Sequence, residues 1–215
     1  MDFMNNIILF FQEGGFFMYP IAFVLAFGIA IAIERYVYLS ASRRTNRKLV
    51  ADLLPILKSG DFQKAYGMTS KQNNAVSRVI NYGLTKIKTA KHRDDIEMAI
   101  EEGMMEIIPR LEKRTHYLAM FANIATLLGL LGTIMGLITA FTAVAKADPS
   151  QKADMLSGSI SVAMNTTAFG LMAAIPLLLI YTVLQTKTTE IVDSLEMVGV
   201  KFVNSIAEKT SFGGK

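Results

Sequence analysis

The sequence contains no cysteine and no tryptophan among its 215 residues, and its only histidines are His92 and His116. Without cysteine it forms neither disulfides nor thiolate metal sites, and the two distant histidines offer no metal-ligand spacing. Only 19% of the residues are charged and 52% are hydrophobic, whereas soluble domains have roughly 25% charged residues. The composition favours a membrane protein and predicts no cofactor.

Charge is absent from three long stretches. Residues 16–33, 117–145 and 157–185 contain no Asp, Glu, Lys or Arg. A membrane-crossing helix needs about 20 predominantly apolar residues. We therefore predict three transmembrane helices, over residues 16–39, 117–145 and 157–185.

Basic residues gather between the first two of these spans. Residues 34–116 hold 16 of the 22 Lys and Arg against 10 Asp and Glu, and the first fifteen residues hold no Lys or Arg. The positive-inside rule then places residues 40–116 in the cytoplasm. It leaves residues 1–15 as a periplasmic or interfacial helix, 146–156 as a periplasmic loop, and 186–215 as a cytoplasmic helix and tail. Because topology explains the basic pI, no nucleic acid partner is expected.

The parts between and after the spans show helical spacing and no strand alternation. Turns are predicted at Gly60–Asp61 and at Asn73–Asn74. The helix that follows is expected to run through Pro109 into the second span, with a kink at the proline. The predicted fold is an all-α membrane protein with three transmembrane helices, the second and third extending into a cytoplasmic helical bundle.

Small side chains follow one face of the second span. Read at alternating steps of three and four, the face consists of Ala119, Ala122, Thr126, Gly129, Thr133, Gly136, Ala140 and Ala143. In lipid, helices associate where small residues let their backbones approach. We expect Gly129, Gly132 and Gly136 to pack against the third span, which offers Gly170.

Polar side chains inside the spans are candidates for an ion pathway. The candidates are Thr133, Asn165, Thr166 and Thr167. Consecutive helical residues point about 100° apart, so Asn165, Thr166 and Thr167 cannot all face one cavity. Thr133 and Thr167 are preferred because both lie near mid-span. The hydroxyls of Thr139, Ser157 and Ser159 are expected to form hydrogen bonds between helices.

The second and third spans contain no carboxylate, amine or imidazole. If the protein conducts protons, a second polypeptide should supply the titratable group. Hydroxyls and backbone carbonyls could instead replace the water around a sodium ion. The sequence has no metalloprotease motif, nucleophile elbow or complete phosphate loop, and we predict that it is not an enzyme.

Three segments resemble a known family. LLGLLGTIMGL in the second span, TTAFGLMAAIPLLLIY in the third and IERYVYL at the end of the first resemble the ExbB/TolQ/MotA ion-channel subunits, the stator-type subunits of membrane motors. Three spans, an outside N-terminus and a large loop after the first span are similar to the ExbB/TolQ branch, because MotA-type subunits have four spans.

The resemblance implies a homo-pentamer in the bacterial inner membrane, with its second and third spans lining a pore. An ExbD/TolR-like protein with a single span would enter that pore and carry the ion on an aspartate, and a TonB-like protein could receive the work. Thr133 in GTIMG and Thr167 in TTAFG match the pore threonines of the family. The implied function is to use proton or sodium flow to energise work such as TonB-dependent import.

Two positions depart from the family pattern. Val162 stands where ExbB-type members often carry a glutamate, and Thr126 stands where a proline is common. An acid is lost and a hydroxyl is gained, so sodium remains an alternative to the proton. Alternative functions are a Tol-Pal or motility stator of the same family and a non-conducting membrane scaffold; a solute carrier would normally show an internal repeat.

Overall fold

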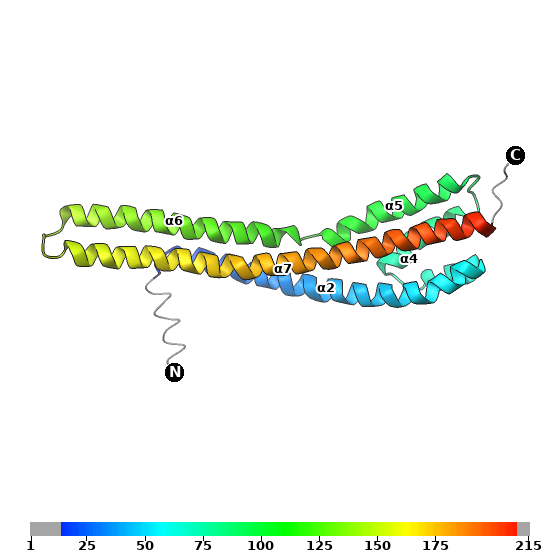
Figure 1. Cartoon of the computed structure of the whole chain (residues 1–215), viewed down its shortest axis with the longest axis horizontal. Helices are drawn as coiled ribbons and strands as arrows, with labels where there is room; N and C mark the ends of the chain where they lie inside the picture. The colour runs from blue at the N-terminus through cyan, green and yellow to red at the C-terminus, as the bar shows by residue number, and fades with distance from the viewer. Residues whose placement is uncertain (1–13, 210–215) are drawn as a thin grey trace, which may run out of the picture. The chain divides into compact units, whose positions relative to one another are not determined.

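The computed structural model describes residues 14–209, which fold into helices joined by short links (Figure 1). The helices are α2 (Met18–Ser59), α3 (Phe62–Thr69), α4 (Ala75–Lys86), α5 (Arg93–Glu112), α6 (His116–Lys146) and α7 (Lys152–Lys209). Residues 14–209 contain no strand, and the predicted all-α fold is confirmed. The expected turns at Gly60–Asp61 and Asn73–Asn74 separate α2, α3 and α4. Residues 1–13 of the predicted N-terminal helix lie outside the described residues.

Three helical stretches are long and apolar enough to cross a membrane. They are Met18–Ser59, Arg93–Lys146 and Lys152–Glu208, and the apolar part of the second stretch lies in α6. The protein is therefore an all-helical membrane protein with three candidate spans. α2 and α7 continue without interruption well beyond their apolar windows.

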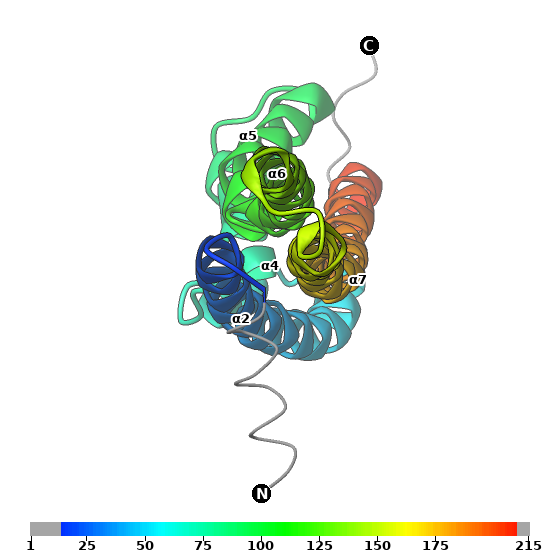
Figure 2. The ribbon, with the colours of Figure 1, turned by 90° about the vertical axis from the view of Figure 1, so that its left-hand side faces the viewer.

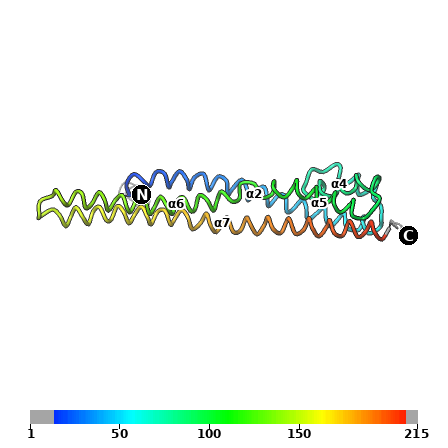
Figure 3. The backbone as a smooth tube through the Cα atoms, turned by 90° about the horizontal axis from the view of Figure 1, so that it is seen from above, coloured from blue at the N-terminus to red at the C-terminus, as the bar shows by residue number. Residues whose placement is uncertain are grey.

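The chain divides into two compact units. The membrane unit comprises residues up to Glu34 together with Arg114–Thr182, and the bundle unit comprises Arg35–Lys113 together with the residues from Val183 onward. In the membrane unit, α6 and α7 run side by side, and the beginning of α2 lies against them (Figures 2 and 3). The bundle unit contains α3, α4, α5 and the remaining parts of α2 and α7.

The bundle unit has a core of large aliphatic and aromatic side chains. Leu53 of α2, Ile80 of α4 and Phe202 of α7 are fully or almost fully buried. The Phe202 ring meets Phe62 of α3 edge to face, with 6.4 Å between the ring centroids. Burying such side chains away from water is the main favourable term in the folding of a soluble domain.

The prediction of one continuous helix kinked near Pro109 is wrong. α5 continues past Pro109, and a link of three residues, Lys113–Thr115, then separates it from α6. Arg114 in this link has a φ of 66°, a left-handed conformation that cannot continue a right-handed helix. The carbonyl oxygen of Leu111 is left open where α5 ends, and it accepts a hydrogen bond from the buried Arg35 of α2.

Glu34, which precedes Arg35 in α2, contacts the link between α5 and α6. Nη1 of Arg114 donates to both carboxylate oxygens of Glu34, at 2.8 and 2.9 Å. A proline is visible in the sequence as a helix breaker, whereas the conformation of Arg114 depends on residues far away in the chain. The break between α5 and α6 therefore lies where Glu34 and Arg35 of α2 supply hydrogen-bond partners, and not at Pro109.

Candidate functional site

The backbones of α6 and α7 lie almost in contact at two glycines of the membrane unit. A methyl group added to Gly170 would lie 2.7 Å from the carbonyl oxygen of Ala125, and one added to Gly129 would lie 3.3 Å from the Cα atom of Thr167. No larger side chain fits at Gly170 without moving a backbone. These glycines set the separation of the two helices.

The other two glycines of the predicted packing set lie beside α7 side chains. A methyl group at Gly136 would lie 2.8 Å from the Cβ atom of Ala163, and one at Gly132 would overlap the methyl group of Thr166. The buried face of α6 consists of Leu118, Ala122, Ala125, Gly129, Gly132 and Ala140.

This buried face is rotated slightly around the α6 axis from the small-residue face predicted from the sequence. Ala125 and Gly132 are buried, whereas Thr126 and Thr133 are half-buried at the edge of the face. Threonine is larger than alanine, and its hydroxyl needs a hydrogen-bond partner when it is buried, so it fits better at the edge of the helix contact. The edge position of Thr133 brings its hydroxyl to the third candidate span.

Thr133 of α6 and Thr167 of α7 form a direct hydrogen bond through their hydroxyl groups. The Thr133 hydroxyl also lies 3.3 Å from the carbonyl oxygens of both Gly129 and Ala163, and the Thr167 hydroxyl lies 2.9 Å from that of Gly129. Four oxygen atoms from two helices therefore converge at one place. A hydroxyl has a single proton to donate, so these bonds are alternatives that can exchange.

Thr166 points away from this pair. Its side chain is 2% exposed, and its hydroxyl lies 2.5 Å from the carbonyl oxygen of Gly14 and 2.9 Å from that of Val162. Its methyl group fills the space beside Gly132. Thr166 thus ties the residues that precede α2 to α7.

Asn165 and Thr139, two further polar residues of the spans, do not bond to the Thr133–Thr167 pair. Asn165 is half-buried, and within residues 14–209 its side chain forms no hydrogen bond. The Thr139 hydroxyl bonds to the carbonyl oxygen of Met135 at 2.9 Å, within its own helix and not to another helix as expected. Of the four ion-pathway candidates, the structure brings only Thr133 and Thr167 together.

A cavity of about 380 Å³ lies on the Thr166 side of the α6–α7 contact, next to the residues that precede α2. Thr139, Ser159, Val162 and Thr166 are among the residues that line it. A methyl group at Gly15 would lie 3.1 Å from the Val162 side chain. The sequence did not reveal this cavity because its walls come from three distant segments.

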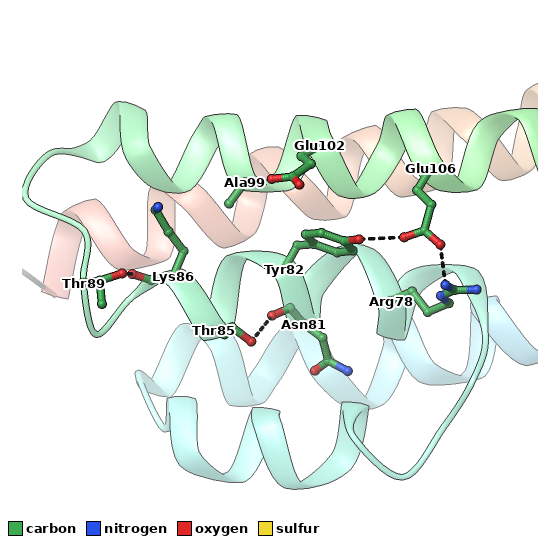
Figure 4. Close-up of a pocket in the computed structure, with 9 residues that line it drawn as sticks. All are labelled: Arg78, Asn81, Tyr82, Thr85, Lys86, Thr89, Ala99, Glu102 and Glu106. Carbon is green, nitrogen blue, oxygen red and sulfur yellow. Dashed lines mark hydrogen bonds and ion pairs between the residues drawn. The ribbon is translucent and has the colours of Figure 1, made fainter.

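The bundle unit has a polar pocket of about 570 Å³ between α4 and α5 (Figure 4). The Glu106 carboxylate of α5 accepts hydrogen bonds from the Tyr82 hydroxyl at 2.7 Å and from Arg78 at 2.5 Å, both on α4. Arg110 pairs with the same carboxylate at 2.6 Å. The i, i+4 spacing of Arg78 and Tyr82 indicates that the two side chains share one face of α4. The sequence does not identify Glu106 as the carboxylate opposite that face.

These contacts shift two pKa values. The hydrogen bond from Tyr82, followed by the positive charges of Arg78 and Arg110, lowers the pKa of Glu106 below its ordinary value of 4.5. The hydrogen bond to Glu106 and the negative charge of that carboxylate raise the pKa of Tyr82 above 10.0. The network is therefore fully formed at neutral pH.

The family described as the MotA/TolQ/ExbB proton channel family matches residues 71–197. A homolog of the biopolymer transport protein ExbB from Methanothermobacter thermautotrophicus is 27% identical over 200 residues, which cover 92% of this chain and 70% of that protein. The Tol-Pal system protein TolQ of Haemophilus influenzae is 36% identical over 83 residues, which cover 39% of this chain and 36% of that protein.

A solved structure shares the fold. The structure of MotAB from C. jejuni matches with a TM-score of 0.60 and 16% sequence identity, over 92% of this chain and 80% of that one. At this identity the likeness supports the arrangement of helices and no residue-level correspondence.

Proposed function

Because the chain belongs to the MotA/TolQ/ExbB proton channel family, we propose that it is the ion-conducting subunit of a motor complex in the bacterial inner membrane. Proton or sodium flow through the complex would energise periplasmic or outer-membrane work, with TonB-dependent import as the leading candidate. The observation that carries this proposal is the meeting of Thr133 and Thr167 between two candidate spans. A Tol-Pal or motility stator would use the same site.

The proposed topology places the N-terminus in the periplasm and the C-terminus in the cytoplasm. The basic excess of residues 34–116 supports a cytoplasmic location for the bundle unit. Glu34 and Arg114, which pair with each other, then lie near the cytoplasmic border of the membrane. Long charged side chains at this level can reach the interface between lipid and water.

The proposed complex contains several copies of this chain, with a pentamer as the expected state. Large apolar side chains on α6 face outward in the single chain, among them Leu127, Ile134 and Phe141. In the assembly they would meet lipid, neighbouring copies or a partner helix. An ExbD/TolR-like helix inside a central pore would supply the carboxylate that the second and third spans lack.

The threonine pair offers two kinds of ion contact. Toward a partner carboxylate or water, each hydroxyl can donate one hydrogen bond and so stabilise the charged form as a proton leaves. Toward sodium, the two hydroxyl oxygens and the carbonyl oxygens of Gly129 and Ala163 can replace water ligands. The residue at position 162 is valine, so this chain adds no carboxylate of its own beside the pair.

A non-conducting scaffold is the second candidate. It is favoured by the fact that the threonine hydroxyls already bond to backbone carbonyls between the helices. In a scaffold these bonds would serve packing alone.

The test is ion flux in liposomes that contain the protein with its single-span partner, under separate proton and sodium gradients. Thr133→Val and Thr167→Val keep the side-chain volume and should abolish flux while the complex remains assembled. Thr142→Val is the matched control, because the Thr142 hydroxyl is exposed and bonds only within its own helix. Unchanged flux in both pair variants would contradict the proposal, and loss of assembly in them would favour the scaffold.

A further inference from the structure

One exposed face of α5 in the bundle unit is acidic. At helical spacing it carries four carboxylates and two methionines: Asp94, Met98, Glu101, Glu102, Met105 and Glu112. Met98 and Met105 are 60% and 73% exposed. None of the four carboxylates forms an ion pair within residues 14–209. Exposed apolar side chains among charges of one sign mark a surface that another molecule covers.

One exposed face of α2 in the same unit is basic. Its four cationic side chains are Arg44, Arg47, Lys48 and Lys58. Ala51 and Pro55 lie exposed between them on the same face. These four cations also form no ion pair with any described residue. The bundle unit therefore presents one face rich in unpaired acidic side chains and another rich in unpaired basic side chains, with Asp52 beside Arg44 and Lys48 at the edge of the basic face.

The two faces belong to opposite sides of the bundle unit. In both Figure 1 and Figure 2, α5 and the later part of α2 lie on opposite sides, with α7 and α4 between them. The acidic and basic faces of one copy consequently cannot pair with each other. A second copy can present its basic face to the acidic face of the first.

Some of the charges on the two faces also lie at the same level along the helices. Arg35 of α2 bonds to Leu111 of α5 and provides a common reference level. At 1.5 Å per residue, Arg44 and Lys48 lie about 14 and 20 Å from that level, and Glu102 and Glu101 lie about 14 and 15 Å from it. Copies related by rotation about the membrane normal keep every residue at its own depth. Only groups at similar depth can then meet, and the long side chains of Lys48 and Glu101 can span the difference of about 5 Å between their levels.

We propose that the acidic α5 face of one copy binds the basic α2 face of its neighbour. This inference rests on the proposed assembly of several copies. The contact joins two different surfaces, so it is heterologous, and such contacts generate closed rings when the rotation closes. The charge pairs set the register of neighbouring bundle units, while the exposed methionines pack against the stems of the basic side chains.

The absence of native cysteine allows a direct test by disulfide cross-linking in the intact complex. Glu101→Cys and Arg44→Cys, which lie about 15 and 14 Å from the common level, are introduced separately and the two variants are co-expressed. We expect a cross-linked dimer from the mixture, no cross-link from either variant alone, and a ladder of oligomers when one chain carries both substitutions. Arg110→Cys with Arg44→Cys is the negative control, because Arg110 is exposed about 180° around α5 from Glu101 and about 14 Å from it along the helix.

The outcomes separate this inference from the proposed function. An intact oligomer without the Glu101–Arg44 cross-link overturns the interface and leaves the motor proposal standing. A strong cross-link of Glu101→Cys with itself also overturns it, because the contact would then be symmetric. A protein that contains a single copy, as judged by its mass in detergent, overturns the proposed assembly as well.

Charge reversal tests whether another occupant uses either face. Lys48→Glu should lower several-fold the salt concentration that dissociates the oligomer, and Glu101→Lys in the same chain should restore it. Restoration supports pairing between copies. If Lys48→Glu weakens the binding of vesicles with anionic headgroups and Glu101→Lys does not restore the oligomer, a lipid surface is the occupant and the inference is wrong.

Discussion

The contact between α6 and α7 in the membrane unit and the core of the bundle unit bury different kinds of side chain. The membrane unit buries glycine and alanine between α6 and α7 and turns large residues such as Leu127 outward. The bundle unit buries large residues such as Ile100 and Phe202 and turns its charges outward. The same polypeptide thus packs its helices against one another in two different ways.

The difference reflects the solvent that each unit meets. Water penalises exposed apolar surface, so large apolar side chains collect in the bundle core. Lipid tails are as apolar as leucine and provide no such drive between helices. Close backbone approach and interhelical hydrogen bonds then become the main stabilising contacts. The Gly129–Gly170 approach and the Thr133–Thr167 bond belong to this second kind.

Truncating a large side chain should separate the two units most clearly. Phe202→Ala removes a fully buried ring from the bundle unit, and we expect it to lower the free energy of unfolding by about 3–5 kcal/mol. Leu127→Ala, at a position that is 63% exposed in the membrane unit, should have little effect in lipid. Chemical denaturation in lipid nanodiscs measures both. Equal losses would contradict the comparison.

Enlarging a small side chain tests the close approach of α6 and α7 directly. Gly170→Val places a methyl group against the carbonyl oxygen of Ala125, and we expect it to cost about 1–3 kcal/mol of stability and to lower ion flux. Gly158→Val is the matched control, since a side chain there meets open space. Thermal unfolding followed by circular dichroism compares them. Similar melting temperatures would show that the close approach does not limit stability.

Helix capping should have a smaller effect on stability and should distinguish the bundle unit, because it operates where helices end in water. The Asn74 side chain accepts a hydrogen bond from the backbone N–H of Ser77 at 2.8 Å, at the start of α4. Asn74→Ala should cost about 1 kcal/mol. Asn73→Ala changes the neighbouring exposed residue, which does not cap the helix. Denaturation midpoints that coincide for the two variants would contradict a capping role.

The smallest expected effect is a pH dependence confined to the bundle unit. The folded-state pKa of Glu106 is lowered, so its contribution to stability is present above pH 4.5 and is lost as pH falls through the lower folded value. Glu106→Gln should reduce stability near pH 7 and converge with the wild type in acid. Glu112→Gln, at an exposed residue of the same helix, is the control. Parallel pH profiles for wild type and Glu106→Gln would exclude this role of the carboxylate.

Much of the fold could be predicted because it depends on local patterns. Long charge-free stretches are visible in the sequence, and so are turn residues such as Gly60, which adopts a positive φ of 80°. The break between α5 and α6 could not be placed, because it depends on Arg35 and Glu34 meeting residues about 80 positions away. Such meetings are set by packing between helices.

The candidate site was predicted in part. The sequence singled out Thr133 and Thr167 by their position near mid-span, and the structure joins their hydroxyls. It could not show that Thr166 binds the Gly14 carbonyl, because neighbouring hydroxyls differ only in the direction set by helix rotation. The Tyr82–Glu106 network was missed for the same reason, since its members come from separate helices.

The sequence by itself therefore determined the class of protein, the number of candidate spans and the residues small enough to let helices approach. These properties follow from composition and period, which each segment carries alone. Only the tertiary structure decided which hydroxyls meet, where α6 begins, and which charges remain unpaired on α2 and α5. Those outcomes depend on how each helix is rotated and shifted against its neighbours, and that is settled by side-chain packing across the whole unit.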